Sequence, residues 1–261
     1  MLKLPYCEVN AFVAQGMLGN PAGVCPLKEW LPVETMQKIA EQNNLSETAF
    51  IVANSEGYDL RWFTPTSEID LCGHATLASA HVIWNHLDYK SERIKFNSCS
   101  GVLEVVKSGE LMSLNFPARA GSEVAWRSDY ETVFKRQDVS DIRLSRDLMF
   151  VLKSESQVRD FKPDFVEIAK FEGFGMLITA PGDKVDFVSR FFLPHDNIPE
   201  DPVTGSTHCM LIPYWAERLG RSDMVAQQLS ARGGELFCRD LGERVEMSGR
   251  AATYLTGEIS I

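Results

Sequence analysis

The chain has 261 residues, of which 44% are hydrophobic and 24% charged, as in globular proteins large enough for two modest cores. Its formal net charge is −10 and it has no cluster of Lys and Arg, which argues against nucleic acid and anionic membranes as partners. No apolar run approaches the length of a membrane span, and the N-terminal residues lack the apolar core of a signal peptide. The six cysteines are scattered, so we expect a cytoplasmic protein with reduced thiols.

The first half of the chain is predicted to alternate strands with two helices. Apolar periodicity indicates strands over 7–13, 48–52 and 61–65, helices over 32–43 and 73–87, and further strands within 94–116. Residues 16–26 hold too many glycines and prolines for regular structure, although a strand can begin at Val24. Glu47 stands at the entrance of a strand, where an acid is either a solvated loop residue or a functional group.

The helix that begins at Gly73 is a candidate anion site. The first N–H groups of a helix have no partner within the helix, and the helix dipole adds partial positive charge there. Cys72 and His74 flank this glycine, and a helix N-terminus is expected to lower the pKa of a nearby thiol or imidazole. Their spacing is not that of a zinc site and no second ligand pair follows, so no metal is predicted.

The second half is predicted to begin after a polar linker over 118–146, which contains a helix over 128–135. Strands and helices then follow over 148–153, 163–171 (helix), 175–180, 190–193, 205–215 (helix), 235–239, 244–248 and 251–255. Pro213 lies inside the last helix, so we expect a kink near Cys209. The helix opens at Gly205 and Ser206, either as an ordinary capped helix or as a second anion site.

The two halves resemble each other in sequence. Residues 61–65 match 190–194 at an offset of 129, and residues 73–75 match 205–207 at an offset of 132. Such constant offsets indicate one unit used twice. If the units pack by pseudo-twofold symmetry, both glycine-opened helices can face one cleft, where ligand sites tend to occur. We therefore divide the chain into residues 1–118 and 119–261, with approximate boundaries and termini that can cross between the halves.

Five motifs together resemble the PhzF-like family of phenazine-biosynthesis isomerases, within the diaminopimelate-epimerase-like superfamily. They occur in the family's order and span most of the chain: Gly19-Asn20-Pro21, Ser46-Glu47-Thr48, Arg61–Pro65, Cys72-Gly73-His74-Ala75-Thr76 and Glu200-Asp201-Pro202-Val203-Thr204-Gly205-Ser206. The resemblance implies an α/β fold of two similar pseudo-symmetric domains, each a barrel-like sheet around a central helix, with the active site between them. It also implies a cofactor-free homodimer that isomerises a small substrate by a proton shift.

The resemblance also implies roles for individual residues. Glu47 is the expected catalytic acid/base, and His74 and Asp201 flank the substrate. The residues expected to bind the substrate are Asn20, Cys72, Gly73, Gly205 and Ser206. Epimerases of the superfamily use two cysteines instead, one at each helix N-terminus. This chain keeps Cys72, and we take Pro202 or Val203 as its counterpart, which excludes a two-thiol mechanism.

Three functions therefore stay open. The leading hypothesis is an isomerase that shifts a proton within a small carboxylated substrate, with Glu47 as the acid/base. The second is an amino-acid epimerase or racemase that uses Cys72 as its base. The third is a small-molecule binding protein without turnover. A catalyst is expected to hold Glu47 within reach of His74 or Asp201, whereas a binding protein can leave it exposed.

Overall fold

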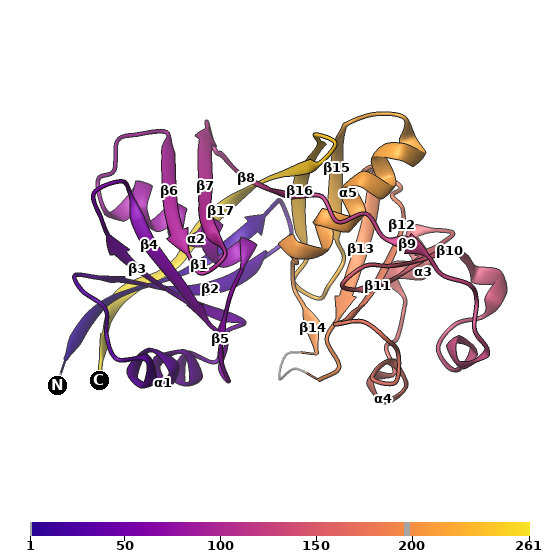
Figure 1. The fold of residues 1–261 in the computed structure, drawn as a ribbon, viewed down its shortest axis with the longest axis horizontal. Coiled ribbons are helices and arrows are strands. Elements are labelled where there is room, and N and C mark those ends of the chain that lie inside the picture. Colours follow the sequence, from indigo (N-terminus) through magenta and orange to yellow (C-terminus); the bar gives the residue numbers. More distant parts are fainter. Residues whose placement is uncertain (1, 196–198) are drawn as a thin grey trace. The chain divides into compact units, whose positions relative to one another are not determined.

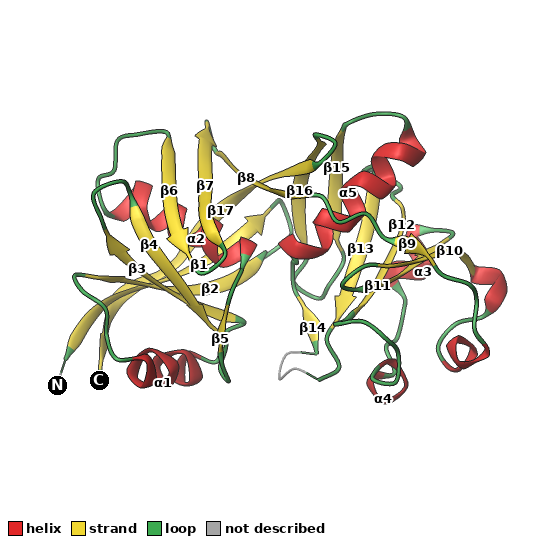
Figure 2. Cartoon of the chain, viewed as in Figure 1, coloured by secondary structure: helices red, strands yellow, loops and turns green. Residues whose placement is uncertain are grey.

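The chain folds into two compact units of mixed α/β structure (Figures 1 and 2). The computed structural model describes residues 2–195 and 199–261, so residues 196–198 of the loop before Glu200 lie outside the described part. Unit 1 comprises Met1–Asn115 and Ser248–Ile261, and unit 2 comprises Phe116–Met247. Residues 248–261, which the sequence analysis placed in the second half while allowing the termini to cross, group with unit 1. No helix among the described residues is long and apolar enough to cross a membrane.

Unit 1 is a curled sheet with one helix inside it and one outside. Its elements are β1 (Lys3–Val13), β2 (Asn20–Leu27), α1 (Val33–Asn43), β3 (Glu47–Ala53), β4 (Tyr58–Phe63), β5 (Glu68–Ile69), α2 (Gly73–His86), β6 (Arg93–Ser98), β7 (Gly101–Ser108), β8 (Leu111–Pro117) and the later residues of β17 (Arg244–Ser260). β1 pairs antiparallel with β2 and β17. β2 runs parallel to β3, and β4 lies between β3 and the parallel strand β6.

The two helices of unit 1 differ in how they are buried. α2 is buried along most of its length and packs against β1, β2 and β3, so it is the central helix of this unit. Its small side chains, among them Ala75, Ala78 and Ala80, let the strands approach from several sides. α1 is amphipathic instead: Met36 and Ile39 lie in a buried cluster under the helix, which confirms the predicted apolar face.

Unit 2 contains the corresponding set of elements. They are β9 (Ser122–Glu123), the 3-10 helices η1 (Ser128–Thr132) and η2 (Arg136–Asp138), β10 (Val139–Leu144), β11 (Leu148–Leu152), α3 (Glu155–Arg159), α4 (Phe165–Ile168), β12 (Met176–Pro181), β13 (Phe187–Phe192), β14 (Glu200–Asp201), α5 (Gly205–Leu219), β15 (Asp223–Gln228), β16 (Gly234–Asp240) and the first residues of β17. α5 is the long buried helix of this unit. Trp215 on α5 donates its indole N–H to Thr179 on β12.

The predicted repeat is confirmed by strand connectivity. β11 runs parallel to β12, β13 pairs antiparallel with β12 and β14 and runs parallel to β15, and β15 pairs antiparallel with β16. In unit 1 the strands β2, β3, β4, β5, β6 and β7 pair in the same order and with the same directions. α2 follows β5 as α5 follows β14. Each unit is thus a barrel-like sheet around a central helix, as the resemblance implied.

Matching ion pairs support the same repeat at the level of side chains. Arg61 on β4 donates two hydrogen bonds to Glu68 on β5, at 2.6 and 2.7 Å. Arg190 on β13 donates two to Glu200 on β14, at 2.7 and 2.9 Å. Each guanidinium also lies over the phenylalanine two residues later in its own strand. These pairs fasten the short strands β5 and β14, which lead into the central helices.

The prediction of irregular structure over residues 16–26 holds for residues 16–19 and was wrong from Asn20 onward. β2 begins at Asn20 and runs to Leu27, with one proline and one glycine near its start. It lies between β1 and β3, where close strand packing outweighs the low strand propensity of these residues. A Cβ atom at Gly23 would lie 3.0 Å from the Tyr6 ring and 3.1 Å from the Thr48 hydroxyl, so glycine suits this crowded position.

The predicted linker over 118–146 was also wrong in part. Its last residues form β10, which pairs with β11 as β1 pairs with β2. Val139 and Ile142 are the buried residues of β10, too few for a clear apolar pattern. The helix expected over 128–135 is the shorter 3-10 helix η1, with η2 just after that range, and the helix expected over 163–171 shortens to α4.

Pro213 lies within an α5 that continues from Gly205 to Leu219. A proline has no N–H, so the carbonyl of Cys209, four residues earlier, loses its helical partner. That carbonyl instead accepts the backbone N–H of Arg119 at 2.8 Å. The segment before β9 therefore donates to the carbonyl that Pro213 leaves unpaired, so the helix can accommodate the proline.

Candidate functional site

Glu47 and His74 form the centre of the candidate site in unit 1. Glu47 is the first residue of β3, and its side chain is 15% exposed. His74 is the second residue of α2, and its side chain is 5% exposed. Glu47 Oε2 lies 3.1 Å from His74 Nε2, at ion-pair distance but without good hydrogen-bond angles. Neither atom has another hydrogen-bond partner among the described residues, which leaves both available to a ligand.

The other nitrogen of His74 contacts two further predicted site residues. Its Nδ1 lies 3.4 Å from Cys72 Sγ and 3.3 Å from Asn20 Nδ2. Asn20 is the first residue of β2 and is fully buried. In a charged imidazole both ring nitrogens carry a proton, so Nε2–H is directed toward Glu47 and Nδ1–H toward Cys72 and the Asn20 amide. The structure thus brings Asn20, Glu47, Cys72 and His74 into one cluster.

The pKa values in this cluster differ from those expected at a helix N-terminus. Burial raises the pKa of Cys72 to about 11, and the nearby Glu47 charge adds to the rise, although His74 opposes it. Burial lowers the pKa of His74, but the Glu47 carboxylate beside it raises that pKa, which lies well above its ordinary value. The expectation that α2 lowers both pKa values was therefore wrong. Cys72 is a protonated thiol at neutral pH, and His74 favours its charged form.

Glu47, Cys72 and His74 offer donor atoms that could in principle hold a metal ion. Cys72 and Glu47, however, approach different nitrogens of one imidazole ring. These nitrogens point in different directions, and a single ion can bind only one of them. The arrangement is therefore better described as a chain from thiol to imidazole to carboxylate than as a metal centre.

The predicted site residues of unit 2 lie around the start of α5. Asp201 is the last residue of β14, and Gly205 and Ser206 form the first turn of the helix. Ser206 Oγ accepts a hydrogen bond from Arg146 Nη2 at 3.1 Å. Sequence reasoning missed Arg146, because it lies between β10 and β11, 60 residues before Ser206, and no motif marks it.

The central helices α2 and α5 begin in the same unusual way. Cys72 and Thr204 are their N-cap residues, and neither side chain caps the helix. The backbone N–H groups in the first turn of each helix therefore lack the usual side-chain acceptor. The N-caps also correct the sequence alignment: the counterpart of Cys72 is Thr204, not Pro202 or Val203. A hydroxyl stands where unit 1 has its thiol, so a two-thiol mechanism is still excluded.

Comparison with known proteins supports this architecture. The sequence profile of the phenazine biosynthesis-like protein family, PhzC-PhzF, matches residues 9–257. A Pseudomonas aeruginosa protein named as an uncharacterized isomerase is 46% identical over 260 residues, covering 100% of both chains. A solved Enterococcus faecalis phenazine biosynthesis protein of the PhzF family is 45% identical, with a TM-score of 0.95 and coverage of 100% of both chains.

A more distant structure shares the fold alone. The hydroxyproline epimerase of Agrobacterium vitis is 9% identical, with a TM-score of 0.60 over 98% of this chain and 92% of its own. The diaminopimelate-epimerase-like fold therefore extends to proteins of other sequence, while the family match covers nearly the whole chain. With its repeated barrel, its glycine-opened helices and its Glu47–His74 pair, the chain belongs to the phenazine biosynthesis-like family.

Proposed function

We propose that the protein is an isomerase that shifts a proton within a small carboxylated substrate, without a cofactor and with Glu47 as the acid/base. The observation that carries this proposal is the Glu47 carboxylate, mostly buried and 3.1 Å from the buried imidazole of His74. A proton shift needs one positioned group that can both take and return a proton. Relatives named as isomerases support the reaction class and leave the substrate open.

His74 supports Glu47 in this proposal. The imidazole of His74 lies beside the carboxylate that takes up the proton. It also provides a positive charge near the place where negative charge develops when a proton leaves carbon. The alternative of a binding protein without turnover is less favoured, because it gives no reason to bury Glu47 against an imidazole rather than leave it in solvent.

The substrate is proposed to be an anion that accepts hydrogen bonds from the N–H groups at the start of a central helix. Neither N-cap side chain of α2 and α5 accepts from the first N–H groups, so a carboxylate can accept from them. Arg146, which also pairs with Asp147, donates to Ser206 near the start of α5. We carry the homodimer forward as a proposal too, to be tested by light scattering on the purified protein.

An epimerase that uses Cys72 is the second candidate, because the thiol lies 3.4 Å from an imidazole nitrogen. One experiment separates the two candidates. Candidate metabolites are first screened for incorporation of solvent deuterium, which reports a proton shift without assuming the product. Glu47→Gln keeps the size of the side chain but cannot accept a proton, so it should lower the exchange rate by about 10²–10⁴-fold.

Cys72→Ser is the matched variant and should retain most of the exchange activity, because the thiol is protonated at neutral pH. Both variants are measured on the same accepted substrate, with circular dichroism to check that each folds. An inactive Cys72→Ser together with an active Glu47→Gln would replace the isomerase assignment by the single-thiol epimerase.

A further inference from the structure

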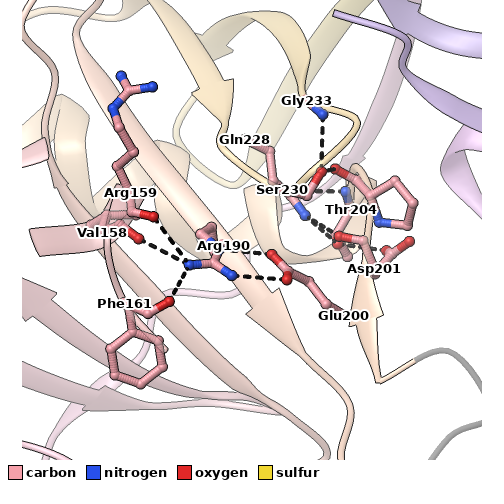
Figure 3. A network of polar contacts seen from close by, with 11 residues as sticks. Val158, Arg159, Phe161, Arg190, Glu200, Asp201, Thr204, Gln228, Ser230 and Gly233 are labelled. Carbon is pink, nitrogen blue, oxygen red and sulfur yellow. Dashed lines mark hydrogen bonds and ion pairs between the residues drawn. The ribbon is translucent and has the colours of Figure 1, made fainter. Parts of the chain in front are cut away.

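Thr204, the residue just before α5, has every polar group engaged within unit 2, and its contacts with Asp201 and Gln228 are drawn in Figure 3. Its backbone N–H donates to Gln228 Oε1 at 2.9 Å. Its hydroxyl donates to Asp201 Oδ2 at 2.5 Å. Its carbonyl accepts from Thr207 Oγ1 at 3.0 Å and faces His208 Nδ1 at 2.8 Å. Thr204 is 6% exposed, so these contacts lie largely away from solvent.

Gln228 determines which way the Thr204 hydroxyl points. Gln228 is the last residue of β15 and is fully buried. Its Nε2 donates to the Asp201 carbonyl at 2.7 Å and to Thr204 Oγ1 at 3.1 Å. An oxygen that accepts from an amide must direct its own hydrogen elsewhere. The Thr204 hydroxyl therefore acts as a donor toward the Asp201 carboxylate, an arrangement visible in Figure 3.

This arrangement leaves the first turn of α5 without a side-chain cap. A threonine at an N-cap normally accepts from the N–H groups of the first turn, which stabilises the helix. Thr204 occupies the N-cap of α5 but makes no such bond: its oxygen accepts from Gln228 instead, and its O–H donates to Asp201. The strand that carries Asp201 is fastened independently, since Glu200 beside it accepts two hydrogen bonds from Arg190. The backbone of Asp201 is thus fixed by β14, and its carboxylate by Thr204.

We propose that Thr204 is a positioning residue that orients the Asp201 carboxylate toward the substrate, with Gln228 holding the Thr204 hydroxyl in its donating direction. The inference rests on the proposed function and on the expectation, implied by the family resemblance, that Asp201 faces the substrate. It gives the Thr204 hydroxyl the role of orienting Asp201. Thr204 stands at the position where unit 1 has the thiol of Cys72. Thr204 acts through Asp201 and takes no proton from the substrate itself.

The test compares Thr204→Val, which keeps the shape but removes the hydroxyl, with Thr204→Ser, which keeps the hydroxyl. Solvent-deuterium exchange on an accepted substrate gives kcat and KM for each. We expect Thr204→Val to lower kcat about tenfold, as for the loss of a hydrogen bond to a charged group, with a smaller change in KM. Thr204→Ser should restore most of kcat. In an Asp201→Asn background, Thr204→Val should cause no further loss.

Thr207→Val is the matched control for a purely structural effect. Thr207 is fully buried one helical turn away, and its hydroxyl also bonds to Thr204, at the carbonyl oxygen. This variant should lower the melting temperature and leave kcat nearly unchanged. If Thr204→Val shows no cooperative thermal transition, Gln228→Met replaces it. That variant removes the amide donor, so we expect a smaller loss of kcat that also disappears in the Asp201→Asn background.

Two results would overturn the inference: a Thr204→Val or Gln228→Met enzyme with wild-type kcat, or a loss that is equally large with and without Asp201. Either result would leave Thr204 with a structural role only. Failure of the proposed function looks different. In that case Glu47→Gln stays active, whatever the Thr204 variants do.

Discussion

The thiol of Cys72 is the residue whose reactivity the structure most clearly limits. Burial raises its pKa to about 11 and Glu47 adds to the rise, so the reactive thiolate is scarce at neutral pH. Cys99 is the exposed cysteine and serves as an internal reference. We expect iodoacetamide near neutral pH to label Cys99 first and Cys72 slowly, as followed by peptide mass spectrometry. Glu47→Gln should speed the labelling of Cys72. Faster labelling of Cys72 than of Cys99 in the native protein would contradict this account.

Sequence motifs indicated the candidate site residues better than the partners of those residues. Glycine-opened helices and an acid at a strand entrance are local patterns, so Glu47 and His74 could be predicted before the fold was known. Arg146 and Gln228 could not, because each meets its partner across distant elements and has no pattern around it. Thr204 was within a quoted motif, but extra loop residues hid its match to Cys72 until the N-caps were seen.

At the scale of elements, the two Arg–Glu pairs should contribute unequally to stability. Arg190 is 8% exposed and also donates to backbone carbonyls, including that of Phe161 at 2.6 Å. Arg190→Met leaves these acceptors and Glu200 without a donor, so we expect a loss of about 3–5 kcal/mol in the free energy of unfolding. Arg61→Met is the matched variant: the Arg61 side chain is 25% exposed, and we expect a loss of about 1–2 kcal/mol. Urea denaturation measures both, and equal losses would show that the carbonyl contacts add nothing.

Elements with a strong apolar pattern were predictable, and elements whose environment overrides their composition were not. α1, α2 and α5 were expected near their observed positions, because their apolar residues recur at helical spacing. β2 was missed because a glycine and a proline suggest a loop, whereas the strands on either side require close packing. β10 was missed because its pairing with β11, and not its own pattern, makes it a strand.

At the scale of the whole molecule, the repeat keeps the framework and changes the chemistry. Both units have the same strand pairing, a bidentate Arg–Glu pair and a central helix without a side-chain cap. β3 begins with Glu47, whereas β12 begins with the buried Met176 at the equivalent offset of 129. The N-cap thiol of unit 1 faces an imidazole, and the N-cap hydroxyl of unit 2 bonds to a carboxylate. One unit thus carries the proposed acid/base, and the other carries a fixed acid.

Buried histidines should set how the stability of the whole protein depends on pH. Burial lowers the pKa of His208 to about 4, although its bond to the Thr204 carbonyl opposes the shift. The unfolded chain then binds more protons than the folded chain between pH about 6.5 and about 4, so this contribution is present above that range and lost as the pH falls through it. Burial lowers the pKa of His81 to about 4 as well, so His81 acts in the same direction. His74, with its raised pKa, acts in the opposite direction and contributes stability that is lost as the pH rises above its ordinary value.

Urea denaturation at a series of pH values tests this balance. We expect the free energy of unfolding to fall on acidification from neutral pH, with His208 contributing up to about 3 kcal/mol. His208→Asn keeps an amide donor near the position of Nδ1 but cannot take up a proton, so it should flatten part of the acid limb. The remaining slope belongs to His81 and to acidic groups. An acid limb of unchanged slope in His208→Asn would mean that His208 is not held neutral in the folded protein, and the direction of its pKa shift would have to be abandoned.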